Sequence, residues 1–143
     1  MRRSQLIAAG DCSSTALQEC SRATVLLGDT LGEMHWYYAL SQVAIVAGSF
    51  APLGGQNLIE ACAIGVPVLV GPHTRNFEQA VVDAMDEGAA LRASDPDAAL
   101  HLALQLLDDP QRMARMGEAG AHWVQKHTGA VARVVAGLNE IKG

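Results

Sequence analysis

Three short apolar runs, each followed by a loop rich in glycine and polar residues, constrain the fold of this chain most. The runs occupy residues 25–27, 43–48 and 66–70. They are continuously apolar rather than alternating, which is typical of strands buried on both faces of a parallel sheet. The loops that follow them are Gly28–Glu33, Ser49–Glu60 and Gly71–Asn76. Because ligands of such sheets bind beyond the carboxyl ends of the strands, the loops predict one shared cleft.

The second loop is the most informative of the three, because it connects a predicted strand to a predicted helix. Its glycines, Gly54 and Gly55, allow backbone amides to approach an anion closely, and the positive end of the following helix adds to the attraction. The alternative for this pair is a plain turn. Its spacing matches neither a dinucleotide fingerprint nor a P-loop, so the loop alone names no ligand class.

The remaining pattern predicts an α/β fold in which strands and helices alternate. We expect strands at 5–9, 25–28, 43–47, 67–71 and 89–92. We expect helices at 13–20, 31–41, 57–64, 76–86, 95–107, 109–126 and 128–141. The class is therefore α/β, with a parallel sheet flanked by helices and a helical C-terminal end. We expect a single domain over residues 1–143, truncated at its N-terminus.

Local signals set several of these boundaries. Gly65, two residues before Pro67, predicts the end of a helix and the start of a strand. Asp95 and Asp109 each precede a proline and predict helix N-caps. We expect Trp36, Tyr37 and Tyr38 to pack on the first helix rather than to stack on a base.

Composition excludes several function classes. The formal net charge is −5 and no block of lysine or arginine occurs, which argues against nucleic-acid binding by a basic face. No apolar run approaches the ~20 residues of a membrane span. The three cysteines lack CxxC spacing, which favours a reducing compartment with ordinary thiols. His122 and His127 are five residues apart, on different faces of a helix, so we expect no metal site.

Four segments, in order and spacing, resemble the C-terminal half of 3-deoxy-D-manno-octulosonic acid (Kdo) transferase. They are Gly28–Glu33, Gly48–Ser49, Gly54–Glu60 and Gly65–Phe77. The resemblance implies a glycosyltransferase with two Rossmann-like domains (GT-B type), of which this chain is the donor-binding half. It implies transfer of Kdo from CMP-Kdo to a lipid A precursor by an enzyme peripheral on the cytoplasmic face of the inner membrane. It also implies that the general base and the acceptor site belong to an N-terminal domain, with no metal or cofactor.

The chain departs from the family pattern at four positions. Gln56 replaces the usual histidine, and Leu53 lies where a basic residue is common. Leu58 and Ala61 lie where the family tends to have prolines. Gln56 donates a neutral hydrogen bond, about half as strong as a charge-assisted one, so these departures bear on the donor rather than on the fold.

Glu60 is the strongest candidate for a ligand contact. In two-domain glycosyltransferases a glutamate at this place accepts hydrogen bonds from ribose hydroxyls, and a carboxylate can accept two at once. The alternative is a reciprocal helix cap with Asn57. Thr30 and Glu33 have the same spacing, and for them ligand binding and a capping box are equally good explanations.

The third loop supplies further candidates. Arg75 is the nearest basic side chain to the expected cleft, and the alternative is a solvated arginine. Thr74 and Asn76 are equally suited to helix capping, and His73 to packing on the sheet edge. Ser49 is placed to donate to a phosphate or to be solvated. The predicted substrate-binding residues are Thr30, Gly32, Glu33, Ser49, Gly54, Gly55, Gln56, Asn57, Glu60, His73, Thr74 and Arg75, and no catalytic residue is expected in this chain.

Two other functions fit parts of the pattern. One is a UDP-sugar-binding domain of the same fold, in a transferase or an epimerase. The other is a non-catalytic flavodoxin-like interaction module with no nucleotide affinity. A comparison of CMP with UDP binding separates all three.

Overall fold

The structure, a computed structural model, describes residues 24–52 and 57–141, and the side chains as far as residue 127. The elements expected at 5–9 and 13–20 lie outside the described residues, as do Gly54, Gly55 and Gln56. The chain divides into two compact units, Met1–Met34 and His35–Gly143.

The prediction of a strand at 25–28, in the first unit, is wrong. A single bridge residue, Leu27, interrupts an otherwise irregular segment, and Val25, Leu26 and Leu27 are 71%, 42% and 50% exposed. A strand is stabilised by pairing along its length and by burial of its apolar side chains, and this run has neither to a sufficient degree. Helix α3 (Met34–Ala39) is shorter than predicted. It begins after residue 31 because Gly32, at φ 80°, adopts a left-handed conformation that a right-handed helix does not contain.

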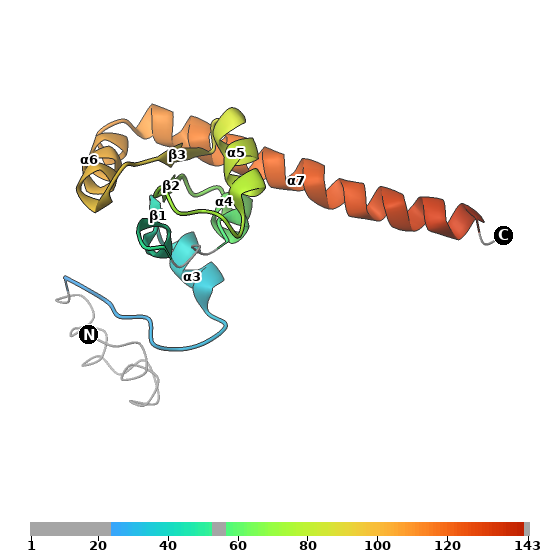
Figure 1. Ribbon diagram of the computed structural model, residues 1–143, viewed down its shortest axis with the longest axis horizontal. Helices are drawn as coiled ribbons and strands as arrows, with labels where there is room; N and C mark the ends of the chain where they lie inside the picture. The colour runs from blue at the N-terminus through green and yellow to red at the C-terminus, as the bar shows by residue number, and fades with distance from the viewer. Residues whose placement is uncertain (1–23, 53–56, 142–143) are drawn as a thin grey trace. The chain divides into compact units, whose positions relative to one another are not determined.

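A parallel three-stranded sheet forms the centre of the second unit (Figure 1). The strands are β1 (Ala44–Val46), β2 (Val68–Val70) and β3 (Ala90–Arg92), in the order β1-β2-β3. Val68 of the central strand pairs with Ala44 on one side and with Ala90 on the other. The parallel sheet and three of the predicted strands are confirmed.

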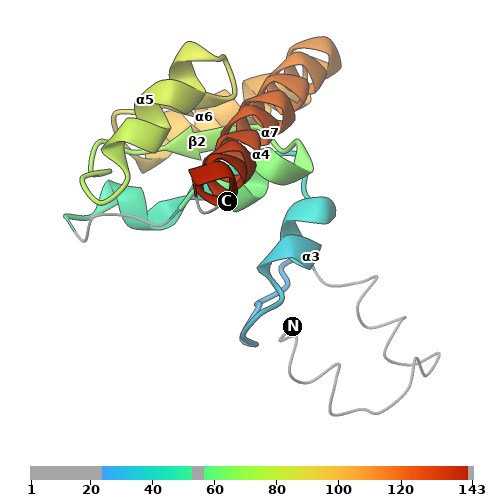
Figure 2. The same cartoon turned by 90° about the vertical axis from the view of Figure 1, so that its right-hand side faces the viewer.

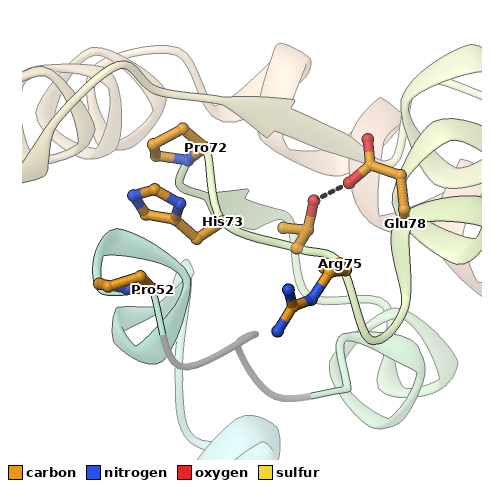
Figure 3. A pocket seen from close by; sticks show the side chains of 6 residues that line it. Pro52, Pro72, His73, Arg75 and Glu78 are labelled. Carbon is orange, nitrogen blue, oxygen red and sulfur yellow. Dashed lines mark hydrogen bonds between the residues drawn. The ribbon is translucent and has the colours of Figure 1, made fainter.

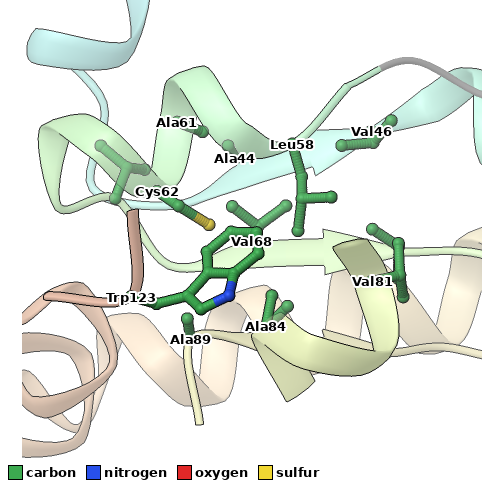
Figure 4. Close-up of a cluster of buried hydrophobic side chains, with 13 residues drawn as sticks. Ala44, Val46, Leu58, Ala61, Cys62, Val68, Val81, Ala84, Ala89 and Trp123 are labelled. Carbon is green, nitrogen blue, oxygen red and sulfur yellow. The ribbon is translucent and has the colours of Figure 1, made fainter. Parts of the chain in front are cut away.

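Helices cover both faces of this sheet. Val68 and Val70 point into a cluster with α4 (Ile59–Ile64), α5 (Glu78–Asp86) and Trp123 (Figure 4). Leu69 points the opposite way, towards α6 (Pro96–Leu107) and Met116. All three residues of β2 are 0% exposed, as the continuous apolar run predicts.

Helix α7 (Pro110–Ile141) contributes to both clusters and packs closely on α4 (Figure 2). Glycines make this approach possible. A Cβ atom on Gly117 would lie 2.2 Å from the carbonyl oxygen of Gly65, and one on Gly120 would lie 3.3 Å from Cys62. Gly65 ends α4 with φ 83°, in the left-handed region, so the predicted helix stop is confirmed.

The helix boundaries agree with most of the local signals. Asp95 accepts a hydrogen bond from the amide of Ala98 at 2.8 Å, and Asp109 accepts one from the amide of Arg112 at 2.9 Å, so both predicted N-caps are confirmed. The two helices expected at 109–126 and 128–141 form one helix, α7. A glycine inside a helix costs only about 1 kcal/mol relative to alanine, and Gly129 does not end it.

The aromatic residues divide between core and surface. Trp123 is 3% exposed and lies in the core, and Tyr38 packs against the same cluster. Trp36 is 62% exposed, so the expected packing of this side chain is wrong, because α3 buries none of its residues fully. Among the described residues, no helix combines the length and the apolar character that crossing a membrane requires.

Candidate functional site

A pocket of about 360 Å³ lies beyond the carboxyl ends of β1 and β2 (Figure 3). Three predicted site residues, His73, Thr74 and Arg75, line it from the loop after β2. Pro52 lines it from the segment that follows β1. The remaining lining residues are Pro72 and Glu78. The structure thus brings two of the three predicted loops to one pocket.

Ser49 connects the end of β1 to the loop after β2 by hydrogen bonds. It lies in the short 3-10 helix η1 (Ala47–Phe50) and is 0% exposed. Its hydroxyl donates to the carbonyl oxygen of Val46 and accepts the amide proton of Gly71 at 2.6 Å. The amide of His73 donates to the carbonyl oxygen of Ser49 at 2.9 Å. The hydroxyl proton of Ser49 is therefore donated to the backbone and not to a ligand. Together the three hydrogen bonds of Ser49 fix the path of the loop after β2.

Glu78 holds the other side of the same loop. The hydroxyl of Thr74, which is 1% exposed, donates to Oε2 of Glu78. Nη2 of Arg92, at the end of β3, donates to Oε1 of Glu78 at 2.8 Å. The hydrogen bond from Thr74 and then the bond from Arg92 hold the pKa of Glu78 below its usual value of 4.5. Glu78 is therefore ionised and engaged at both oxygens.

Arg75 and His73 are the polar side chains that the loop leaves exposed to the pocket. Neither side chain makes a hydrogen bond or an ion pair with any described residue. A guanidinium presents five N–H donors in a planar fork that matches phosphate and carboxylate groups. An exposed, unengaged arginine beside this pocket is therefore chemically suited to hold an anionic group.

Glu60 is also exposed, on the first turn of α4. The oxygen Oδ1 of Asn57 accepts a hydrogen bond from the amide of Ile59 at 3.0 Å, whereas the reciprocal bond from Glu60 is not formed within the described part of the chain. Burial, with the nearby charge of Glu60 as the second cause, raises the pKa of Tyr38 above its usual 10.0. The N-cap of α4 is Leu58, without a side-chain cap bond, so the capping-box alternative for Asn57 and Glu60 is wrong.

Thr30, Gly32 and Glu33 belong to the first unit. The hydroxyl of Thr30 donates to the carboxylate of Glu33, so the two side chains bond to each other. The convergence of this loop with the other two stays a prediction, as do the donor contacts of Gly54, Gly55 and Gln56.

Comparison with known proteins identifies the family of the chain. The sequence model of the family glycosyl transferases group 1 matches residues 15–123. The chain belongs to the group 1 glycosyl transferases.

Relatives of this group 1 chain include Kdo transferases. The 3-deoxy-D-manno-octulosonic acid transferase of Bordetella pertussis is 60% identical over 119 residues, which are 83% of this chain and 28% of that protein. The transferase of Haemophilus influenzae is 33% identical over 112 residues, 78% of this chain and 26% of that protein. The chain thus spans about a quarter of the length of these relatives.

A solved structure resembles most of this group 1 chain. It is the crystal structure of the C-terminal CMP-Kdo binding domain of WaaA from Acinetobacter baumannii. The TM-score is 0.72 and the identity 32%, over 87% of this chain and 60% of that one. The predicted resemblance to Kdo transferases and the predicted Rossmann-like fold are both confirmed.

Sequence reasoning missed Glu78 and Arg92 at this pocket, although a signal for Arg92 exists. Arg92 lies at the carboxyl end of the run at 89–92, and the rule that selected the other loops applies to this strand as well. Glu78 begins α5, and Thr74 lies in the loop before it, so the helix spacing rule does not connect the two. Pro52 and Pro72 carry no comparable signal, because their contribution is to wall shape.

Proposed function

We propose that this chain is the donor-binding domain of a Kdo transferase and that it holds CMP-Kdo at the pocket beyond β1 and β2. The observation that carries the proposal is the similarity to the solved CMP-Kdo binding domain, at 32% identity over 87% of the chain. That level of identity, together with a 60% identical Kdo transferase, supports a common ligand as well as a common fold.

The chemistry assigned to the domain is the binding and activation of the donor. The acceptor hydroxyl displaces CMP at the anomeric carbon of Kdo, and negative charge develops on the departing phosphate. Arg75 is placed to bind that phosphate or the Kdo carboxylate, since its guanidinium is exposed and unengaged. Glu60 accepts hydrogen bonds from the ribose hydroxyls. Ser49 and Thr74 act by positioning the loops, because both side chains are buried and bonded within the fold.

We assign the rest of the reaction to the enzyme of which this domain is a part. An N-terminal acceptor domain supplies the general base and binds the lipid A precursor. That enzyme is peripheral on the cytoplasmic face of the inner membrane. Gly54, Gly55 and Gln56 stay predicted contacts of the donor, outside the described residues.

A two-dimensional NMR titration of the isotope-labelled chain with CMP, and separately with UDP, tests the proposal. We expect saturable shifts for CMP at the amides of His73, Thr74 and Arg75 and on the first turn of α4, with weaker or no shifts for UDP. Equal or stronger binding of UDP would favour the UDP-sugar alternative. A well-dispersed spectrum that responds to neither nucleotide would refute donor binding and favour the interaction module.

Paired substitutions identify the contacts. Glu60→Gln keeps the side-chain shape but loses the charge, and we expect about tenfold weaker CMP binding or more, the value of a hydrogen bond to a charged group. Glu118→Gln is the matched control, because Glu118 is exposed on α7, away from the pocket. Arg75→Gln with Arg115→Gln as its control repeats the comparison for the cation. Equal affinities within a pair would remove that residue from the site.

A further inference from the structure

Glu78 poses a physical problem for an anion-binding pocket. It lines the pocket with Arg75, so the two charged side chains on the wall have opposite signs. Its side chain is 49% exposed, and an unpaired carboxylate there would repel a phosphate or a carboxylate of the ligand. A favourable effect of Glu78 on ligand binding must therefore come from the residues to which it is hydrogen-bonded.

The contacts of Glu78 indicate what it holds. Oε2 of Glu78 accepts a hydrogen bond from the hydroxyl of Thr74, drawn as the dashed line in Figure 3. Oε1 accepts a hydrogen bond from Nη2 of Arg92 at 2.8 Å. Thr74 is thereby fixed inside the fold at 1% exposure, while its two neighbours in sequence, His73 and Arg75, are exposed. The carbonyl oxygen of Thr74 also accepts the amide of Phe77 at 2.9 Å, which closes the turn into α5.

Arg92 reduces the repulsion between Glu78 and an anionic ligand. It does not line the pocket, but its guanidinium neutralises Glu78 from the side of β3. Among the charged side chains that line the pocket, Arg75 is then the one whose charge is not paired within the described part of the chain. The loop after β2 is thus held on both sides, by Ser49 from β1 and by Glu78 with Arg92 from α5 and β3.

We propose that Glu78 and Arg92 are a positioning pair for the donor pocket, which fixes Thr74 and so orients Arg75 and His73 towards the ligand. The proposal rests on the proposed function for its ligand and adds two residues that act through the loop. Binding to a loop that is already ordered avoids the entropic cost of ordering it, which is how such a pair raises affinity.

The test uses a substitution for which charge and positioning predict opposite results. Glu78→Ala removes a negative charge from the pocket wall, so a purely electrostatic role predicts tighter binding of CMP. A positioning role predicts weaker binding, by roughly threefold to tenfold, the range that one net hydrogen bond represents. Arg92→Leu is expected to weaken binding in the same direction. Glu87→Ala is the matched control, because Glu87 forms a comparable exposed ion pair with Lys126 at 3.2 Å.

A second measurement does not depend on the ligand. Hydrogen exchange at the amide of Phe77, followed by NMR without nucleotide, should accelerate in Glu78→Ala and stay unchanged in Glu87→Ala. The amide of His73, bonded to Ser49, is the internal reference. Glu78→Ala leaves the buried hydroxyl of Thr74 without its acceptor, so urea unfolding should show a loss of about 1–3 kcal/mol. Glu87→Ala removes only an exposed ion pair and should unfold nearly as the unsubstituted chain does.

The outcomes separate the two proposals. Unchanged exchange at Phe77, or CMP affinity equal to or higher than that of the unsubstituted chain, would overturn the positioning role. If the unsubstituted chain binds no CMP, the proposed function fails and the donor-positioning role fails with it. Exchange at Phe77 then still decides whether the pair holds the loop.

Discussion

Two glycine-to-alanine substitutions in α7 test whether the close approach of α4 and α7 is required by sterics. A Cβ on Gly117 would lie 2.2 Å from the carbonyl oxygen of Gly65 and 3.1 Å from its carbonyl carbon. The first distance is more than 1 Å below the ~3.5 Å at which non-bonded atoms attract best. The obstacle is backbone, and Gly65 is held by its left-handed conformation and by a hydrogen bond from its amide to the carbonyl oxygen of Cys62 at 3.0 Å. The nearest atoms to a Cβ on Gly120 are 3.3 Å away.

The expected magnitudes follow from two opposing terms. Alanine is favoured over glycine inside a helix by about 1 kcal/mol, and this gain is the same at both positions. Overpacking a close contact costs typically 1–3 kcal/mol, and a backbone oxygen at 2.2 Å places Gly117→Ala at the upper end. We expect Gly117→Ala to lower the free energy of unfolding by about 1–2 kcal/mol. We expect Gly120→Ala to change it by less than about 1 kcal/mol, in either direction.

Urea unfolding followed by circular dichroism and tryptophan fluorescence measures both variants. Trp123, in the core beside α4, reports the packing of this interface. The m-values should equal that of the unsubstituted chain, so that a change of midpoint is a change of stability. Free energies of unfolding for the two variants that agree within about 0.5 kcal/mol would refute the steric argument. So would a Gly117→Ala variant that is more stable than the unsubstituted chain.

Other parts of the structure lead to four further predictions. Cys62 is buried, which raises its pKa to about 11, so iodoacetamide should label it in urea but not in the folded chain, as peptide mass spectrometry would show. The stability linked to this thiol should be complete below pH 9.0 and be lost as the pH rises through about 11, and labelling of the folded chain at neutral pH would contradict this. Asp95→Ala should cost about 1 kcal/mol by loss of the N-cap, whereas an unchanged urea midpoint would show that the cap is not needed. Gly71→Ala should cost about 1–3 kcal/mol, because its Cβ would lie 2.5 Å from the carbonyl oxygen of Ser49; a variant of unchanged stability would mean that the loop gives way. The pKa of Glu78, measured by ¹³C NMR of its carboxyl carbon, should lie below 4.5, and a value at or above 4.5 would contradict the bonded geometry. The hydrogen bonds of the carboxylate should therefore persist above pH 4.5 and be lost as the pH falls through the folded pKa.

The strands show where sequence patterns succeed and where they do not. The runs that contain β1 and β2 were predicted as buried strands, and Val68, Leu69 and Val70 are 0% exposed. The run at 25–27 has the same apolar composition, yet it is exposed and bridged at a single residue. Composition reports the tendency of a segment to be buried, but pairing also requires a neighbour, and no property of the segment itself supplies one.

The candidate site was likewise predicted only in part from the sequence. The order of strands and loops was sufficient to select His73, Thr74 and Arg75, because the ends of neighbouring parallel strands meet at one edge of a sheet. It did not indicate that Thr74 points inward while Arg75 points outward. Ser49 was expected as a ligand contact, and its burial and its bond to the backbone of Val46 depend on the approach of β1 and β2.

The sequence by itself determined the class of fold, the parallel strands and most helix boundaries, because these depend on local properties: apolar runs, caps such as Asp95, and stops such as Gly65. It also carried the motifs by which the family is recognised. Only the tertiary structure decided that Glu78 is paired with Arg92, fourteen residues away, and that Arg75 is left unengaged. Which charges meet is set by how the strand ends converge in space, and spacing along the chain does not specify that convergence.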